Sequence, residues 1–486
     1  MKKRSLTENV FFNMLYQVLV TVLPVITTPY IARSLGLHSN GIHSFTESIV
    51  TYFLIFGALG TSLYGIRKVA YVRDDEEELA RVTKEIISLR ILLMLLTLAV
   101  YIPMLCINNP YAQIYRIHII NIVATGLDIT WFYQGVEDFK KVTIRNLVVK
   151  FIFIVCLFTF IKTPDDLPWY ILMNVLSSLI GNLIMIFYLP QYIDLKKGKQ
   201  LKRLKHLKPC LILFVPQAMN YIYALIDRSM LGWMTNTDNV GLYDQAQRIV
   251  RMITAILQSV GYVMMARVAN LTASNDREGI IAYVRKSINF NLFIAFPAML
   301  GILGVADDFI PFFLGEEYLG SIPVLKILSV LIFITSMNSL MGVQMLIPLG
   351  KEKRYTLATT GGAVVSVVLN ALLIPKLGIF GSCIAGLAAE STVFIISFIG
   401  LRDMLHIRTM IKDNIGVFVG AILMFGAVYL VATLDINLIL KLALELLGGA
   451  GVYFAFAAIT KNEIFFMLLD KVLVFLKKFT TKRKAI

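Results

Sequence analysis

Long apolar stretches recur along the chain, separated by short segments that contain Gly, Pro and charged residues. A largely apolar segment of about 18 residues or more can cross the hydrocarbon core of a bilayer as an α-helix. With the Gly, Pro and charge clusters as boundaries, the pattern predicts fourteen spanning helices. They lie near residues 10–33, 42–66, 85–107, 113–135, 143–162, 168–190, 209–233, 241–267, 284–306, 322–348, 354–375, 379–401, 413–434 and 439–460.

The composition supports an all-α polytopic membrane protein. Hydrophobic residues make up 57% of the 486 residues and charged residues only 16%, with a mean hydropathy of +0.74, whereas charged residues form about 25% of a soluble domain. A membrane β-barrel would show alternating strands of about ten residues, which this pattern does not contain. The four cysteines stand singly in apolar stretches, so neither a disulfide framework nor a metal site is expected.

The net charge of +15 raises the question of nucleic-acid binding, but the Lys and Arg residues collect in alternate loops. The positive-inside rule then places both termini in the cytoplasm and gives the charge a topological role, so no nucleic-acid partner is expected. The most basic loop, Gln191 to Lys208, is expected to be a linker held by anionic lipid headgroups. We expect a multi-pass membrane protein.

A shift of 200 residues relates the two halves of the chain. It aligns Gly41 with Gly241, Ile49 with Ile249 and Arg67 with Arg267, and the corresponding spans keep the same orientation. A parallel repeat of two bundles is a transporter architecture with its site near the repeat interface. The predicted divisions are an N-terminal six-helix bundle, a basic linker, a C-terminal six-helix bundle, and two further spanning helices with a basic amphipathic tail, at residues 1–190, 191–208, 209–401 and 402–486.

The segment from Pro29 to Gly60 reads PYIARSLGLHSNGIHSFTESIVTYFLIFGALG, which ends one apolar helix, turns, and begins another. Its Pro-Tyr, Arg, Leu-Gly, Gly and Ser-Ile-Val spacing resembles the N-terminal signature of the polysaccharide biosynthesis or oligosaccharide flippase family, within the multidrug/oligosaccharidyl-lipid/polysaccharide exporter superfamily. The resemblance implies that undecaprenyl-pyrophosphate-linked oligosaccharide repeat units are moved to the outer leaflet by alternating access, for capsule, exopolysaccharide or O-antigen-type export. It implies a lipid-linked oligosaccharide substrate, and a polysaccharide polymerase and assembly proteins as partners.

A pyrophosphate substrate calls for permanent cations, and guanidinium groups supply a bidentate donor fork. Arginines inside or at the edges of the spans are therefore expected to bind the headgroup, together with amide side chains on the polar faces of the first and seventh spans. The expected substrate-binding residues are Arg33, Arg228, Arg248, Arg251, Asn13, Gln17 and Asn220. Snorkelling to the interface is the alternative for Arg33, and Asp244, four residues before Arg248, is an alternative partner for that arginine.

Carboxylates within the spans are expected to bind a coupling ion or to hold one conformation closed. A charge at the centre of a spanning helix costs about 2.5 to 3.5 kcal/mol, so such residues usually face a cavity or a partner. These candidates are Glu47, Asp128, Asp227 and Glu390. An arginine partner on another helix is the alternative for each of them. No cofactor is expected, and transport is expected to couple to a Na⁺ or H⁺ gradient or to the membrane potential.

Three other functions compete with polysaccharide-unit flipping. A multidrug antiporter would favour acidic and aromatic residues over arginines, whereas a lipid II flippase of the same architecture is hard to separate by sequence. A membrane polymerase or ligase would be expected to carry a long outer loop with catalytic residues, but the longest predicted outer loop, Val305 to Ser321, is short. No HExxH, Walker A or nucleophile-elbow pattern is present, so the chain is not expected to be an enzyme.

Overall fold

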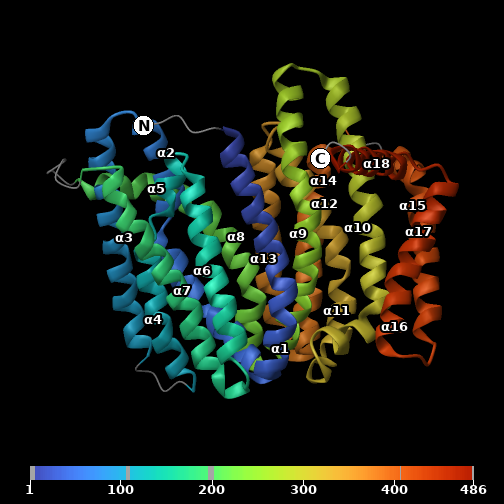
Figure 1. Cartoon of the computed structure of the whole chain (residues 1–486), viewed down its shortest axis with the longest axis horizontal. Coiled ribbons are helices and arrows are strands. Elements are labelled where there is room, and N and C mark those ends of the chain that lie inside the picture. The colour runs from blue at the N-terminus through green and yellow to red at the C-terminus, as the bar shows by residue number, and fades with distance from the viewer. Residues whose placement is uncertain (1–5, 106–109, 195–201, 405–406, 484–486) are drawn as a thin grey trace. The chain divides into compact units, whose positions relative to one another are not determined.

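The computed structural model describes residues 6–105, 110–194, 202–404 and 407–483. Side chains are described for these residues apart from 6–22, 216, 220, 259–263, 266, 407, 408, 472 and 475–483. The chain divides into two compact units, Met1–Asp244 and Gln245–Ile486. The described residues are helical with short connections and include no strand, which confirms the all-α class (Figure 1).

The first unit contains eight helices and the first residues of a ninth. They are α1 (Leu6–Ala58), α2 (Thr61–Val72), α3 (Glu76–Met104), α4 (Ala112–Gly126), α5 (Thr130–Gly135), α6 (Phe139–Phe160), α7 (Leu167–Tyr188), α8 (Leu207–Met234) and α9 (Thr237–Ala273), with short turns η1 (Pro164–Asp166), η2 (Leu189–Gln191) and η3 (Arg203–His206). Helix α4 packs along α7, and α1 contacts α3, α4, α6 and α8. One buried cluster, with Trp131, Phe132 and Tyr133, forms part of the core.

The second unit contains the rest of α9 and the remaining helices. They are α10 (Arg277–Phe313), α11 (Ser321–Leu328), α12 (Val330–Met341), α13 (Glu352–Leu377), α14 (Ile379–Leu401), α15 (Ile407–Ala432), α16 (Leu438–Ala443), α17 (Gly449–Ile459) and α18 (Glu463–Arg483), with η4 (Glu316–Tyr318) and the π-helical turns η5 (Gly342–Leu346) and η6 (Leu444–Gly448). Helix α13 packs along α14 and α10 along α15. Helix α18 contacts α10 and α17 and runs across them (Figure 1).

The number of spans predicted from the sequence stays a prediction. Among the described residues, ten helices are long and apolar enough to cross a bilayer, or up to eleven if the pair Arg203–Val215 and Gln217–Met234, bent by 43°, is one span. One of the ten, Leu23–Val72, holds the second predicted span and the last residues of the first, because α1 continues past a kink at Gly36. At this kink φ is 71°, a left-handed conformation that glycine adopts without steric penalty.

Two predicted spans are interrupted in the structure. The predicted helix 42–66 stops at Ala58, and α2 begins after Gly60, whose φ is also 71°. The predicted helix 113–135 is divided into α4 and α5 around Asp128. The Asp128 side chain accepts a hydrogen bond from the backbone N–H of Thr130, 2.9 Å away, and so competes with continuous helical hydrogen bonding at this point.

The described end of the basic linker is anchored inside the first unit by Glu85 of α3, which is fully buried. One carboxylate oxygen accepts a hydrogen bond from the backbone N–H of Lys202 at 2.9 Å, and the other lies 2.8 Å from both Lys205 Nζ and His206 Nε2. The His206 Nδ1 atom is 2.7 Å from the hydroxyl of Tyr64. Residues 195–201 of this linker, where its binding to lipid headgroups was expected, lie outside the described residues.

The Glu85 contacts predict that Glu85→Ala loosens the linker. Loss of the charged hydrogen bonds should lower stability by about 2 to 3 kcal/mol, seen as a lower thermal midpoint in detergent and as faster trypsin cleavage at Lys202 and Arg203. The matched control is Glu77→Ala, an exposed glutamate two turns earlier on the same helix. Equal midpoints and cleavage rates for the two variants would contradict the anchoring role.

Candidate functional site

Residues that the 200-residue repeat relates lie opposite one another in the first unit. His38 Nδ1 is 2.6 Å from Asp238 Oδ1, and Ser44 Oγ donates a hydrogen bond to Asp244 Oδ2 at 2.9 Å. Between these pairs, Gly41 lies against Gly241. Positions that meet their own counterparts are what a two-fold relation between repeats produces. We call these residues, together with the buried polar residues that contact them on α1, α8 and α9, the paired-turn cluster.

The two glycines allow the backbones of α1 and α9 to meet directly. A Cβ atom at Gly41 would lie 2.0 Å from the carbonyl oxygen of Thr237, and a Cβ atom at Gly241 would lie 3.2 Å from the Cα atom of Gly41. No side chain fits at 2.0 Å, so glycine at position 41 is a steric requirement of this contact.

A buried ion pair lies at the centre of the paired-turn cluster. Asp244 is completely buried, and its Oδ1 atom accepts a hydrogen bond from Arg228 NH1 at 3.1 Å while its Oδ2 atom accepts the one from Ser44. Arg228 is 9% exposed. Two opposite charges that are removed from water together cost much less than either alone, so each fixes the position of the other. Arg228 comes from α8, so helical spacing could not indicate it. The Arg248 pairing that the spacing indicates for Asp244 stays a prediction.

Further polar contacts extend this cluster along α1 and α8. The hydroxyl of Tyr243 donates to Asp227 Oδ2 at 2.9 Å. Ser229 Oγ donates to Ser48 Oγ at 3.2 Å and lies 3.0 Å from the hydroxyl of Tyr52. The cluster therefore brings together two predicted site residues, Asp227 and Arg228. It adds Ser229 and Tyr243, which the sequence reasoning missed. Tyr243 could have been found from the repeat, because it directly precedes Asp244, the residue that the 200-residue shift aligns with Ser44.

Asp128, a predicted coupling or gating residue, belongs to a second cluster in the first unit. Arg90 of α3 is 2% exposed, and its NH2 atom is 3.4 Å from Asp128 Oδ2. The same guanidinium donates to the carbonyl oxygen of Thr125 and to the hydroxyls of Thr61 and Ser62 at 2.8 to 3.1 Å. An arginine on another helix is the alternative that the sequence left open for Asp128. This contact joins α2, α3 and the α4–α5 break.

The remaining predicted acids have different surroundings. The Glu47 side chain is 41% exposed, with its Oε2 atom 3.9 Å from Nε2 of the buried His43. Glu390 on α14 is half-buried, and Asn338 Nδ2 donates to both its Oε2 atom at 2.6 Å and its backbone oxygen at 2.9 Å.

The other predicted substrate-binding residues are less buried or fall outside the described side chains. Arg33 is exposed, Arg248 is half-buried, and Arg251 is exposed with NH1 donating to Gln247 Oε1 at 2.9 Å. The side chains of Asn13, Gln17 and Asn220 lie outside the described residues. Within the described part of the chain, no group of three or more His, Cys, Asp and Glu residues has the geometry to hold a metal ion. Binding roles for these residues stay predictions.

Comparison with known proteins agrees with this architecture. The model of the family described as "Polysaccharide biosynthesis protein" matches residues 6–266. The chain is similar to the "Putative O-antigen transporter" of Escherichia coli (strain K12), with 22% identity over 408 residues, which cover 82% of this chain and 98% of that protein.

Two solved structures share the fold. One is the "Lipid II flippase MurJ, inward closed conformation", with a TM-score of 0.73 and 18% identity over 94% of this chain and 99% of that one. The other is an inward-facing multidrug resistance MATE family transporter of the MOP superfamily, with a TM-score of 0.61 and 14% identity over 83% and 96%.

The Arg228–Asp244 pair predicts a strongly coupled mutant cycle. Asp244→Ala leaves Arg228 buried without this partner and should cost about 3 to 5 kcal/mol, whereas removing Arg228 as well, in Arg228→Met/Asp244→Ala, should restore part of the loss. Thermal unfolding of the purified protein measures both changes. The control is Asp238→Ala, whose exposed pair with His38 should contribute at most about 1 kcal/mol. Additive losses in the double variant would contradict the pairing.

The glycine contact predicts that Gly41→Ala destabilises the protein, because the added methyl group overlaps the Thr237 carbonyl. Such overpacking typically costs about 1 to 3 kcal/mol, measured as a lower thermal midpoint and a lower folded yield. Gly426→Ala on α15 is the matched control, since its Cβ would have no other atom within 4 Å. A midpoint for Gly41→Ala as high as that of Gly426→Ala would show that the backbones do not meet at this position.

Proposed function

Because the chain belongs to the polysaccharide biosynthesis protein family, we propose that it is a flippase for lipid-linked polysaccharide repeat units. Its substrate is an undecaprenyl-pyrophosphate-linked oligosaccharide, which it moves from the inner to the outer leaflet by alternating access for capsule, exopolysaccharide or O-antigen-type export. The similarity to an O-antigen transporter over 98% of that protein supports this substrate class. The relatives are transporters, and we assign the chain no catalytic role.

The observation that carries the mechanism is the buried Arg228–Asp244 pair in the paired-turn cluster. A pyrophosphate offers several anionic oxygens and competes with a carboxylate for a guanidinium group. Arg228 therefore has two alternative anionic partners, Asp244 in the substrate-free protein and the lipid headgroup in the loaded one. When Arg228 exchanges Asp244 for the headgroup, Asp244 loses its cationic partner, and its contact with Ser44 is released. The headgroup then binds the released state more tightly than the paired state, which is the difference in affinity that a change of state requires.

We also propose headgroup contacts for the exposed and half-buried cations. Arg248 and Arg251 lie one turn apart on α9, and Arg33 lies on α1 just before the Gly36 kink. Asn13, Gln17 and Asn220 supply amide donors and acceptors for the sugar or phosphate. Glu47, Asp128, Asp227 and Glu390 remain the candidates for coupling or gating, with a Na⁺ or H⁺ gradient or the membrane potential as the energy source.

The membrane setting follows from the charge pattern. The distribution of basic loops supports a cytoplasmic location for both termini, and we propose the bacterial cytoplasmic membrane as the membrane that the chain spans. A groove of about 510 Å³ in the first unit has an apolar lining from α3, with Lys84 and Arg203 among its lining residues. This combination suits an anionic lipid, with its tails on the apolar wall and its headgroup near the two cations. A polysaccharide polymerase and assembly proteins complete the proposed set of partners.

The substrate class is tested in proteoliposomes. Wild-type protein should move a labelled undecaprenyl-pyrophosphate-linked oligosaccharide between leaflets, and Arg248→Ala/Arg251→Ala should slow this movement about tenfold or more, because each charged hydrogen bond is worth about 1.5 to 3 kcal/mol. Removal of the exposed Arg402, whose side chain is 74% exposed, is the control and should leave the rate unchanged. Unchanged movement in the double variant would refute the headgroup role of the two arginines.

The same vesicles separate the rival functions. Labelled lipid II and an organic cation are offered in place of the oligosaccharide lipid. A preference for lipid II would reassign the protein as a lipid II flippase, and export of the cation alone would reassign it as a multidrug antiporter.

A further inference from the structure

The second unit contains a buried carboxyl group that none of the functional roles above uses. Glu445 lies in the π-helical turn η6, between α16 and α17, and is 1% exposed. Neither of its carboxyl oxygens accepts a hydrogen bond from any donor among the described residues. Single π-helical turns inside α-helices occur frequently at functional sites, because the wider turn displaces one residue from the regular helical position.

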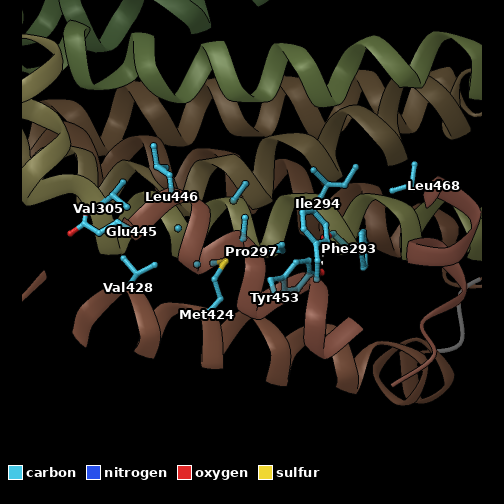
Figure 2. Close-up of a pocket in the computed structure, with 15 residues that line it drawn as sticks. Phe293, Ile294, Pro297, Val305, Met424, Val428, Glu445, Leu446, Tyr453 and Leu468 are labelled. Atoms are coloured by element: carbon cyan, nitrogen blue, oxygen red, sulfur yellow. Dashed lines mark hydrogen bonds between the residues drawn. The ribbon is translucent and has the colours of Figure 1, made fainter. Parts of the chain in front are cut away.

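Glu445 faces an apolar cavity of about 360 Å³ in the second unit. Residues of α10, α15 and α17 form most of its wall, among them Pro297, Met424 and Tyr453. Figure 2 shows Glu445 at one end of this cavity, next to Val305. The hydroxyl of Tyr453, a polar group of the wall, donates to the backbone oxygen of Phe293 at 2.7 Å and is thus already engaged. The cavity wall therefore offers an ionised Glu445 little to stabilise its charge.

The charged neighbours of Glu445 lie on the two helices that meet at this end of the cavity. Lys441, one turn earlier on α16, contacts both carboxylate oxygens of Asp308 on α10, with Nζ at 3.1 and 2.9 Å. These two side chains are only 15% and 16% exposed. The Glu445 carboxyl is in side-chain contact with Asp308. Asp307, the next acid on α10, is held by Lys326 of α11 at 2.6 Å and is much more exposed.

Two carboxyl groups in contact cannot form a hydrogen bond when both are ionised, because neither has a proton to donate. One proton removes the conflict: the neutral acid donates to the carboxylate, and the net charge of Glu445, Asp308 and Lys441 becomes zero. Without that proton, one ammonium group faces two carboxylates, and the buried site holds an uncompensated negative charge.

We propose that Glu445 and Asp308 form a proton-binding site, in which the proton resides on Glu445 and is donated to Asp308, while Lys441 holds Asp308 ionised. The proton is the ligand because the two carboxyls supply both the donor and the acceptor. On release, the proton leaves Glu445 for solvent at the end of α10 and α16 near Asp307, and Lys441 becomes shared between the two carboxylates. As a route for coupling flipping to a proton gradient, this site rests on the proposed function, whereas proton binding itself does not.

Infrared difference spectroscopy of the full-length protein in lipid nanodiscs tests the proton site without any substrate. We expect a carbonyl stretch of a protonated carboxyl group at neutral pH that shifts on exchange into D₂O. The band should vanish in Glu445→Gln, change position in Asp308→Asn, and persist in Asp307→Asn, the matched control on the neighbouring position. Glutamine keeps the shape of the side chain, and thermal unfolding checks that each variant is folded.

Two outcomes would overturn the proposal. The first is a folded Glu445→Gln protein whose spectrum at neutral pH equals that of the wild type, because Glu445 would then hold no proton. The second is a band that Na⁺ abolishes in the wild type but not in Asp308→Asn, because the site would then bind a metal cation.

Flipping under an imposed pH gradient tests the coupling role separately. Wild-type flipping should accelerate with the gradient, and Glu445→Gln should flip at one rate with and without it. A gradient response that persists in Glu445→Gln would overturn the coupling role. Absence of flipping in the wild type, with the infrared band present, would count against the proposed function and leave the proton site standing.

Discussion

The structure depends on one constraint: a charge removed from water must meet an opposite charge or several donors. Arg228 meets Asp244, Arg90 meets Asp128, and Glu85 meets Lys205 and His206. In each case the partners come from different helices or from a helix and the linker, so neutralising the charge also fixes where two segments lie. The strongest polar contacts of the first unit are thus those that determine its helix arrangement.

The sequence predicted the features that depend on many residues at once. The all-α membrane class follows from composition and from the length of the apolar stretches. The 200-residue offset predicted which positions correspond, of which Gly41 and Gly241 proved to be in contact. Specific partners were harder to predict. Helical spacing reveals only neighbours on the same helix, so it could indicate Arg248 for Asp244 but could not reveal the contact that Arg228 makes from α8. The break around Asp128 was missed because it arises from a local hydrogen bond to the backbone N–H of Thr130, which hydropathy does not reveal.

Glu85 and Glu445 illustrate how the surroundings of a buried carboxyl group decide its role. Glu85 receives hydrogen bonds from a backbone N–H, an ammonium group and an imidazole, so its ionised form is stabilised and it acts as a fixed anchor. Glu445 lies beside another carboxyl and an apolar cavity. Both residues are glutamates within predicted spans, Glu85 at the first position of its span and Glu445 in the interior of its own. The difference arises entirely from which segments pack against each of them.

The contact between Gly41 and Gly241 constrains how this chain can be recombined with its relatives. The backbone of each turn packs directly against the backbone of the other. The two turns must therefore match each other in sequence, even though 200 positions separate them. A chimera that joins the first turn of one relative to the second turn of another has to match two backbones that were never selected together. Exchanges of substrate specificity between family members should therefore keep residues 36–44 and 236–244 from the same parent, and place their junctions elsewhere.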